Sequence, residues 1–145
     1  MPQNKHIVII LYFNSPMGGL HLNVIDTVKF LIKNNIKVTV IGKNGVFQKE
    51  IEQLKANYLS INFENIDYDT NYIISKLDTP NIIHTHPFKA KNIAIKLSKY
   101  YKIPLIMTLH SINDNSIKSY EKDIDLFISV SELVKQYIIK QNIEH

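Results

Sequence analysis

The run HIVIILYF, residues His6–Phe13, decides the class of fold. It is apolar almost throughout and rich in β-branched side chains, which predicts a strand buried on both faces of a sheet. A loop with the sequence NSPMGG follows at residues 14–19, and residues 22–34 carry apolar side chains at the spacing of a helix. A buried strand that leads through a glycine-containing loop into a helix is typical of a parallel α/β sheet.

The same alternation continues to the end of the chain. Further strands are expected at residues 37–41, 58–63, 81–85, 104–109 and 125–130, and further helices at 46–57, 71–77, 89–101, 117–122 and from Ser131 onward. Strands that alternate with helices imply right-handed crossovers. We therefore predict an α/β fold in a single domain over residues 1–145, with a Rossmann-like, doubly wound parallel sheet of about six strands between two helical layers.

Composition removes several classes of function. The 145 residues are 45% apolar, enough for one domain with a core, and no stretch approaches the roughly 20 apolar residues of a membrane span. The chain has no cysteine, which excludes disulfides and thiolate metal sites and is compatible with the cytoplasm. All 17 basic residues are lysine, which argues against nucleic-acid binding, because arginine is the usual reader of guanine edges and phosphates.

Histidines gather where a ligand is expected. In a doubly wound sheet, ligands bind at the carboxyl ends of the strands where the strand order reverses, between the first and fourth strands. The segments 14–21, 84–88 and 110–111 follow the first, fourth and fifth strands and should line one crevice. Four of the six histidines fall within them, namely His21, His84, His86 and His110.

Each of these segments has a functional and a plain interpretation. Gly18 and Gly19 precede a helix, where they either let the backbone approach a phosphate or form an ordinary turn. His84 and His86 are two residues apart and should face the same side, with His84 the more buried and His86 the better ligand-binding candidate. His110 either exchanges a proton or hydrogen bond with a ligand or is satisfied by backbone. These three histidines could form a metal site, but no nearby carboxylate would orient them, and we expect no metal.

Four motifs in order give the chain a resemblance to a known family. They are Gly18–Gly19 with the helix-to-strand segment 33–40 (KNNIKVTV), residues 80–86 (PNIIHTH), residues 102–110 (KIPLIMTLH) and residues 125–131 (DLFISVS). Together they resemble the N-terminal domain of GT-B glycosyltransferases of family 4. The resemblance departs from the family pattern at Leu20–His21 and at Asn81, which replaces a common aspartate.

The resemblance implies a retaining, metal-independent hexosyltransferase that needs no cofactor. Sugar would pass from a nucleotide-diphospho-sugar to a saccharide or lipid-linked acceptor, in cell-surface glycan synthesis. By the same resemblance, Gly18 and Gly19 would contact the diphosphate of the donor and His110 would be catalytic. The acceptor would be bound by His84, His86 and Ser111. The family's C-terminal donor-binding domain would be absent from residues 1–145, so we expect the chain alone to be inactive.

The resemblance also implies a place and partners, and two alternatives stay open. We expect a cytoplasmic location. The lysines around Tyr100 and Tyr101 also allow a peripheral contact of the protein with the inner face of the membrane. One alternative is a non-catalytic carbohydrate- or phosphate-binding partner subunit of a split GT-B enzyme. The other, a dinucleotide-binding Rossmann domain, is disfavoured because Lys43–Asn44 stand where an acidic ribose-binding residue would follow the second strand.

Overall fold

The computed structural model describes residues 4–13 and 18–143, and within them one parallel sheet forms the centre of the molecule. Its strand order is β3-β2-β1-β4-β5-β6, and every neighbouring pair is parallel. The strands are β1 (His6–Ile10), β2 (Lys37–Gly42), β3 (Asn57–Ser60), β4 (Ile82–Thr85), β5 (Leu105–Leu109) and β6 (Leu126–Ser129). The predicted fold class is confirmed, and the strand order reverses between β1 and β4, as expected.

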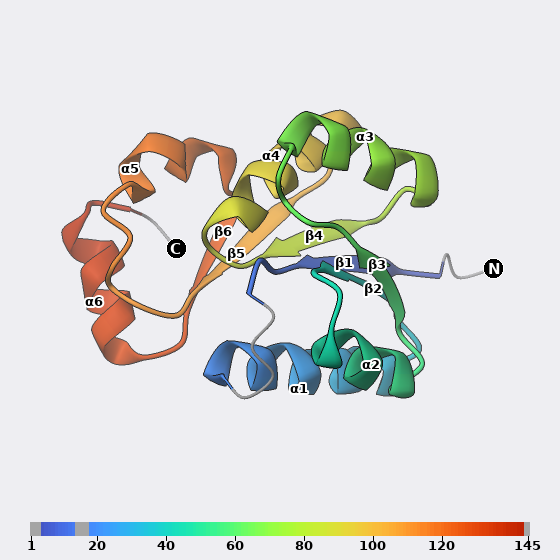
Figure 1. The fold of residues 1–145 in the computed structure, drawn as a ribbon. Helices are drawn as coiled ribbons and strands as arrows, with labels where there is room; N and C mark the ends of the chain where they lie inside the picture. The colour runs from blue at the N-terminus through green and yellow to red at the C-terminus, as the bar shows by residue number, and fades with distance from the viewer. Residues whose placement is uncertain (1–3, 14–17, 144–145) are drawn as a thin grey trace.

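Helices cover both faces of this sheet and make the predicted three layers (Figure 1). They are α1 (Gly19–Lys33), α2 (Val46–Gln53), α3 (Ile66–Lys76), α4 (Lys89–Tyr101), α5 (Ile117–Tyr120), a 3-10 turn at Glu121–Asp123, and α6 (Glu132–Lys140). The helices α1 and α2 lie on one face and α3 and α4 on the other, with α5 and α6 beside the β6 edge. None of the helices in the described residues has the length and apolar character that a membrane span requires.

Strand β1 shows why the first run is apolar at every position. Ile9 and Leu11 pack with Val24 and Val28 of α1 in one core, whereas Val8 and Ile10 belong to the core on the opposite face. Burying one such side chain contributes about 1.5–3 kcal/mol. A polar residue at every second position would remove the apolar contacts of the strand with one of the two cores. The strand is therefore fixed in its central position by both helical layers.

Polar caps set the start of two helices, one of which differs from the prediction. Helix α3 begins at Ile66 rather than residue 71, because Asn65 Oδ1 accepts a hydrogen bond of 3.0 Å from the Tyr68 amide and Asp67 lies in the first turn. The predicted cap at Ser131 is present, with its Oγ 3.3 Å from the Val134 amide. Most of the predicted 14–19 loop lies outside the described residues, and α1 already begins at Gly19.

Candidate active site at the carboxyl ends of the strands

Three histidines form a ladder on the side of β4 and β5 that faces α1. His84 pairs in register with Ile9, whose side chain packs against α1, and His84 Nε2 lies 2.7 Å from Thr108 Oγ1. His86 Nδ1 lies 2.8 Å from His110 Nε2. The ring centroids of His84 and His86, and those of His86 and His110, are each 5.0 Å apart. The segments after β4 and β5 therefore meet through direct side-chain contact, and we call His84, His86 and His110 the histidine ladder.

The burial of the ladder corrects one prediction. His86 is 1% exposed and its Nε2 has no hydrogen-bond partner among the described residues, whereas His84 is only partly buried. The expectation that His84 is the more buried of the two is wrong. The His86 amide still donates to the Ile10 carbonyl at 3.0 Å, so the chain stays within the sheet past Thr85. His84 instead borders a groove of about 500 Å³ between α1 and the strands β4, β5 and β6.

Burial keeps the ladder neutral. It lowers the pKa of His84 to about 4, with the charge of His110 acting in the same direction. It lowers the pKa of His86 well below its ordinary value, helped by the charges of His84, His110 and His21. Burial also lowers the pKa of His110. Near pH 7 all three rings are thus uncharged, and their chemistry is hydrogen bonding and proton acceptance.

The hydrogen bond between His86 and His110 links the roles of the two rings. A neutral imidazole has one N–H and one bare nitrogen. If His110 Nε2 donates to His86, then His110 Nδ1 is an acceptor; if His86 donates, then His110 Nδ1 is a donor. Either tautomer leaves His110, which is half-buried, with a defined group to offer a hydroxyl. The alternative in which backbone satisfies His110 is not what the structure contains, since its partner is the His86 ring.

The start of α1 lies close to this ladder. Gly18 is the N-cap and Gly19 the first helical residue, with no side-chain cap and no acidic residue in the first turn of the described helix. An added Cβ at Gly18 would lie 3.4 Å from His21 Nδ1, and at Gly19 it would meet no described atom within 4 Å. His21 is buried and its charge is among the causes that lower the pKa of His86. The helix end therefore presents amide donors near the buried end of the ladder, and no described atom crowds Gly19.

The conformation of Gly18 removes one reason for a glycine there. Its φ is −92° and its ψ is 156°, an extended conformation that any residue adopts. The backbone conformation at this position therefore does not require a glycine.

Ser111 lies in a pocket of about 310 Å³ beside the ladder. The pocket is formed by the segments that follow β4 and β5, and its lining is Pro87, Phe88, Lys91, Leu109, Ser111, Asn113, Asp114, Asn115 and Ser116. Phe88 is 55% exposed and has φ 67° and ψ −145°, a costly conformation for a bulky side chain. Such strain concentrates at functional sites, and no motif at Phe88 predicts it.

A row of aromatic rings borders the same edge of the sheet. Its neighbouring centroids are 4.9 to 5.4 Å apart, and its members in order are Phe88, Phe13, Tyr12 and Phe63. Lys43 Nζ lies 4.0 Å and Lys89 Nζ 5.6 Å from the centroid of the Tyr12 ring. Sequence reasoning assigned Tyr12 and Phe13 to the first strand and missed this row. The signal was available, because the apolar run ends in two aromatic residues that β1 does not include.

The described residues do not assemble a metal-binding group of three or more histidine, cysteine or acidic side chains. One nitrogen of each ladder histidine is already committed to a contact with Thr108 or with the neighbouring ring. The arrangement is therefore suited to binding and orienting a polar organic ligand between neutral imidazoles, aromatic edges, lysines and a helix N-terminus.

Known proteins share this architecture. No protein-family model matches the sequence, and no curated protein sequence matches it either. HepE (Alr3699) of Anabaena, solved in complex with UDP and glucose, has a TM-score of 0.78 and 17% identity over 97% of this chain and 42% of its own. A glycosyltransferase from Rickettsia africae has a TM-score of 0.77 and 17% identity, covering 97% and 41%. The TrkA-N domain of the Escherichia coli inner membrane protein YbaL has a TM-score of 0.62 and 11% identity, covering 97% and 98%.

These similarities establish the fold. The chain spans about two fifths of the length of HepE and of the Rickettsia glycosyltransferase, but nearly all of the TrkA-N domain. A Rossmann-like architecture hosts many unrelated activities, so the site must carry the functional argument. In architecture, the chain corresponds to one half of a GT-B glycosyltransferase.

Proposed function

We propose that the chain is the N-terminal, acceptor-side domain of a retaining glycosyltransferase. The enzyme transfers a hexose from a nucleotide-diphospho-sugar to a saccharide or lipid-linked acceptor in cell-surface glycan synthesis, at the cytoplasmic side of a membrane. A second domain, on the rest of a longer chain or on a partner subunit, supplies most of the donor site.

The observation that carries this proposal is the contact between His86 and His110, 2.8 Å apart, beside the uncapped start of α1. In the transfer, the acceptor hydroxyl oxygen bonds to the anomeric carbon as the bond from that carbon to the diphosphate breaks. Negative charge grows on the leaving diphosphate, which takes up the hydroxyl proton. The amides at Gly18 and Gly19 face that charge, since a helix N-terminus attracts anions. Neutral His110 binds a hydroxyl at the reaction centre, and buried His86 holds its ring in one tautomer.

Of the three residues predicted to bind the acceptor, His84, His86 and Ser111, only Ser111 keeps that role in this proposal. Ser111 lines the pocket beside the ladder, together with the exposed ring of Phe88. His84 lies one step further from the carboxyl edge and contacts Thr108, so its role is to support His86 from below rather than to reach the acceptor. The UDP and glucose in the HepE structure support a nucleotide sugar as donor, as a property of that protein.

Substitution of His110 in the full-length gene product tests the proposal. We expect His110→Ala to lower turnover by roughly 10²–10⁴-fold, as for loss of a positioned acid–base or hydrogen-bonding group, with the fold retained. His6→Ala is the control for loss of a hydrogen-bonded histidine, because His6 bonds to Thr39 at 2.9 Å but lies at the amino end of β1, away from the candidate site. Unchanged turnover in His110→Ala would instead favour the alternative of a non-catalytic partner subunit.

A further inference from the structure

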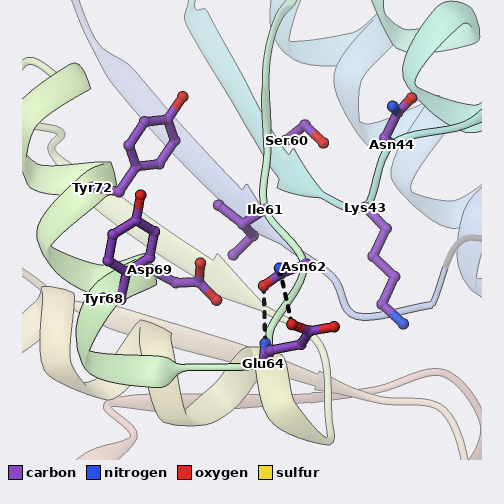
Figure 2. Close-up of a pocket in the computed structure, with 9 residues that line it drawn as sticks. All are labelled: Lys43, Asn44, Ser60, Ile61, Asn62, Glu64, Tyr68, Asp69 and Tyr72. Atoms are coloured by element: carbon purple, nitrogen blue, oxygen red, sulfur yellow. Dashed lines mark hydrogen bonds between the residues drawn. The ribbon is translucent and has the colours of Figure 1, made fainter.

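A second pocket, of about 680 Å³, lies at the carboxyl ends of β2 and β3 (Figure 2). Its lining comes from the segment after β2, the segment after β3 and the first turns of α3, and consists of Lys43, Asn44, Ser60, Ile61, Asn62, Glu64, Tyr68, Asp69 and Tyr72. This size falls within the roughly 300–1,000 Å³ of typical small-molecule sites. None of these residues has a part in the proposed transfer chemistry.

Asp69 is the unusual residue of this pocket. It is 4% exposed, and its Oδ2 is buried with no hydrogen-bond partner among the described residues. Figure 2 shows its carboxylate pointing from α3 toward the segment that contains Asn62 and Glu64. Burial raises the pKa of Asp69, an amide hydrogen bond from Phe63 lowers it, and the charge of Glu64 raises it. A buried carboxylate oxygen without a donor is costly, and a ligand that supplies the donor removes that cost.

The walls opposite Asp69 are built and held in place. Asn62 Oδ1 accepts from the Glu64 amide at 3.1 Å, and Asn62 Nδ2 donates to Glu64 Oε2 at 3.3 Å. Phe63 between them has φ 63°, a left-handed conformation that reverses the chain here. Tyr68 and Tyr72 are four residues apart and share one face of α3, so their rings lie next to each other on the α3 side of the pocket (Figure 2).

This set of groups matches a polyhydroxylated ligand. It combines carboxylate, amide and hydroxyl oxygens with amide and hydroxyl donors and two tyrosine rings. Vicinal hydroxyls of a sugar both donate and accept, and the C–H face of a sugar ring packs on an aromatic ring. A multivalent anion such as a diphosphate fits poorly, because Glu64 and Asp69 outnumber the single lysine in the lining.

A series of side-chain contacts links the pocket to the candidate active site. Lys43 lines the pocket and lies over the Tyr12 ring, which contacts Phe63 on one side and Phe13 on the other. Phe13 in turn contacts Phe88, next to the ladder. We propose that the acceptor is a saccharide of more than one unit and that a sugar remote from the reaction centre binds in this pocket, with its hydroxyls donating to Asp69. That this sugar belongs to the acceptor rests on the proposed function, whereas its binding to Asp69 does not.

Amide NMR spectra of the chain, titrated with D-glucose, N-acetyl-D-glucosamine and myo-inositol, test the pocket without any transfer reaction. We expect at least one of the three to shift the amides of Asn44, Asn62, Asp69 and Tyr72 in a saturable way. Asp69→Asn should weaken that binding about tenfold or more, since it removes a charge-assisted acceptor. Asp67→Asn is the matched control, because Asp67 is on the same helix, pairs with Lys96 at 3.0 Å and does not line the pocket.

Folding of the variants is checked by their melting curves. Asp69→Asn is isosteric and relieves a buried charge, so it should fold, and Tyr68→Ala changes a ring that is 68% exposed and should also weaken binding. Absence of saturable shifts at the pocket with all three probes, or equal affinity of the wild type and both variants, would overturn the proposal. If His110→Ala loses turnover but no sugar binds at Asp69, only this proposal is wrong. If a sugar binds at Asp69 but His110→Ala is fully active, only the proposed transferase function is wrong.

Discussion

Acidification should destabilise the folded protein through its histidine ladder. The folded state holds the pKa of His84 at about 4, against 6.5 for an ordinary histidine, and the pKa values of His86 and His110 are lowered too. The unfolded chain therefore binds more protons than the folded chain over this range. Its stability is greatest above pH 6.5 and falls as the pH drops toward the folded pKa values.

The size of the effect follows from the shift at His84. Between pH 7 and pH 5, a pKa difference of this size lowers the free energy of unfolding by about 2 kcal/mol. His86 and His110 add losses of the same sign, and His6, whose pKa burial also lowers, adds another. Asp69 has a raised pKa and opposes them, because its protonation on acidification favours the folded state.

Denaturant unfolding at a series of pH values, followed by circular dichroism, measures this loss. The comparison variant is His84→Gln, which cannot titrate and whose amide can still bond to Thr108, the partner of His84 at 2.7 Å. We expect the variant to lose about 2 kcal/mol less than the wild type between pH 7 and pH 5. A free energy of unfolding that stays flat over this range, or the same slope in both proteins, would refute the buried, neutral ladder.

Three further predictions follow from the site. Gly19→Glu should stabilise α1 by about 0.3–1 kcal/mol, because it places a negative charge at a helix N-terminus that has none. The same change should raise the KM of the full-length enzyme for its nucleotide sugar, and equal KM values would argue against diphosphate binding at this helix end. Phe88→Gly should raise the free energy of unfolding by about 1 kcal/mol, because relief of the strained backbone outweighs the lost contact with Phe13. A loss of several kcal/mol in denaturant unfolding would contradict this prediction. The chain alone should show no measurable sugar transfer and bind UDP no more tightly than about 1 mM in calorimetry, an affinity of roughly 4 kcal/mol; micromolar binding would mean that the donor site does not need a second domain.

The sheet was predictable from the sequence because each strand has its own physical signal. A strand covered by helices on both faces must be apolar at every position, as Val8 and Ile9 show by packing into opposite cores. Alternation with helices then restricts the topology to right-handed crossovers. The start of α3 was missed, although Asn65 and Asp67 form a recognisable N-terminus, because its apolar periodicity is weak and the cap outweighed it.

The site was only partly predictable. The rule for doubly wound sheets located the segments after β1, β4 and β5, but burial depends on which helix covers which strand. His86 is enclosed, whereas His84 borders a groove between α1 and the sheet, and nothing local in HTH distinguishes them. The Asp69 pocket was missed for a related reason, since its lining joins residues 43–44, 60–64 and 68–72 through tertiary contacts alone.

The most direct test of a ligand crevice at the reversal of strand order is an amide NMR titration of the chain with UDP at millimolar concentration. UDP is the probe because HepE was solved with it. We predict that the largest shifts fall on Gly18, Gly19, His86, His110 and Ser111, which belong to three segments far apart in sequence. Shifts confined to the amino ends of the strands, around His6 and Lys37, would contradict the account.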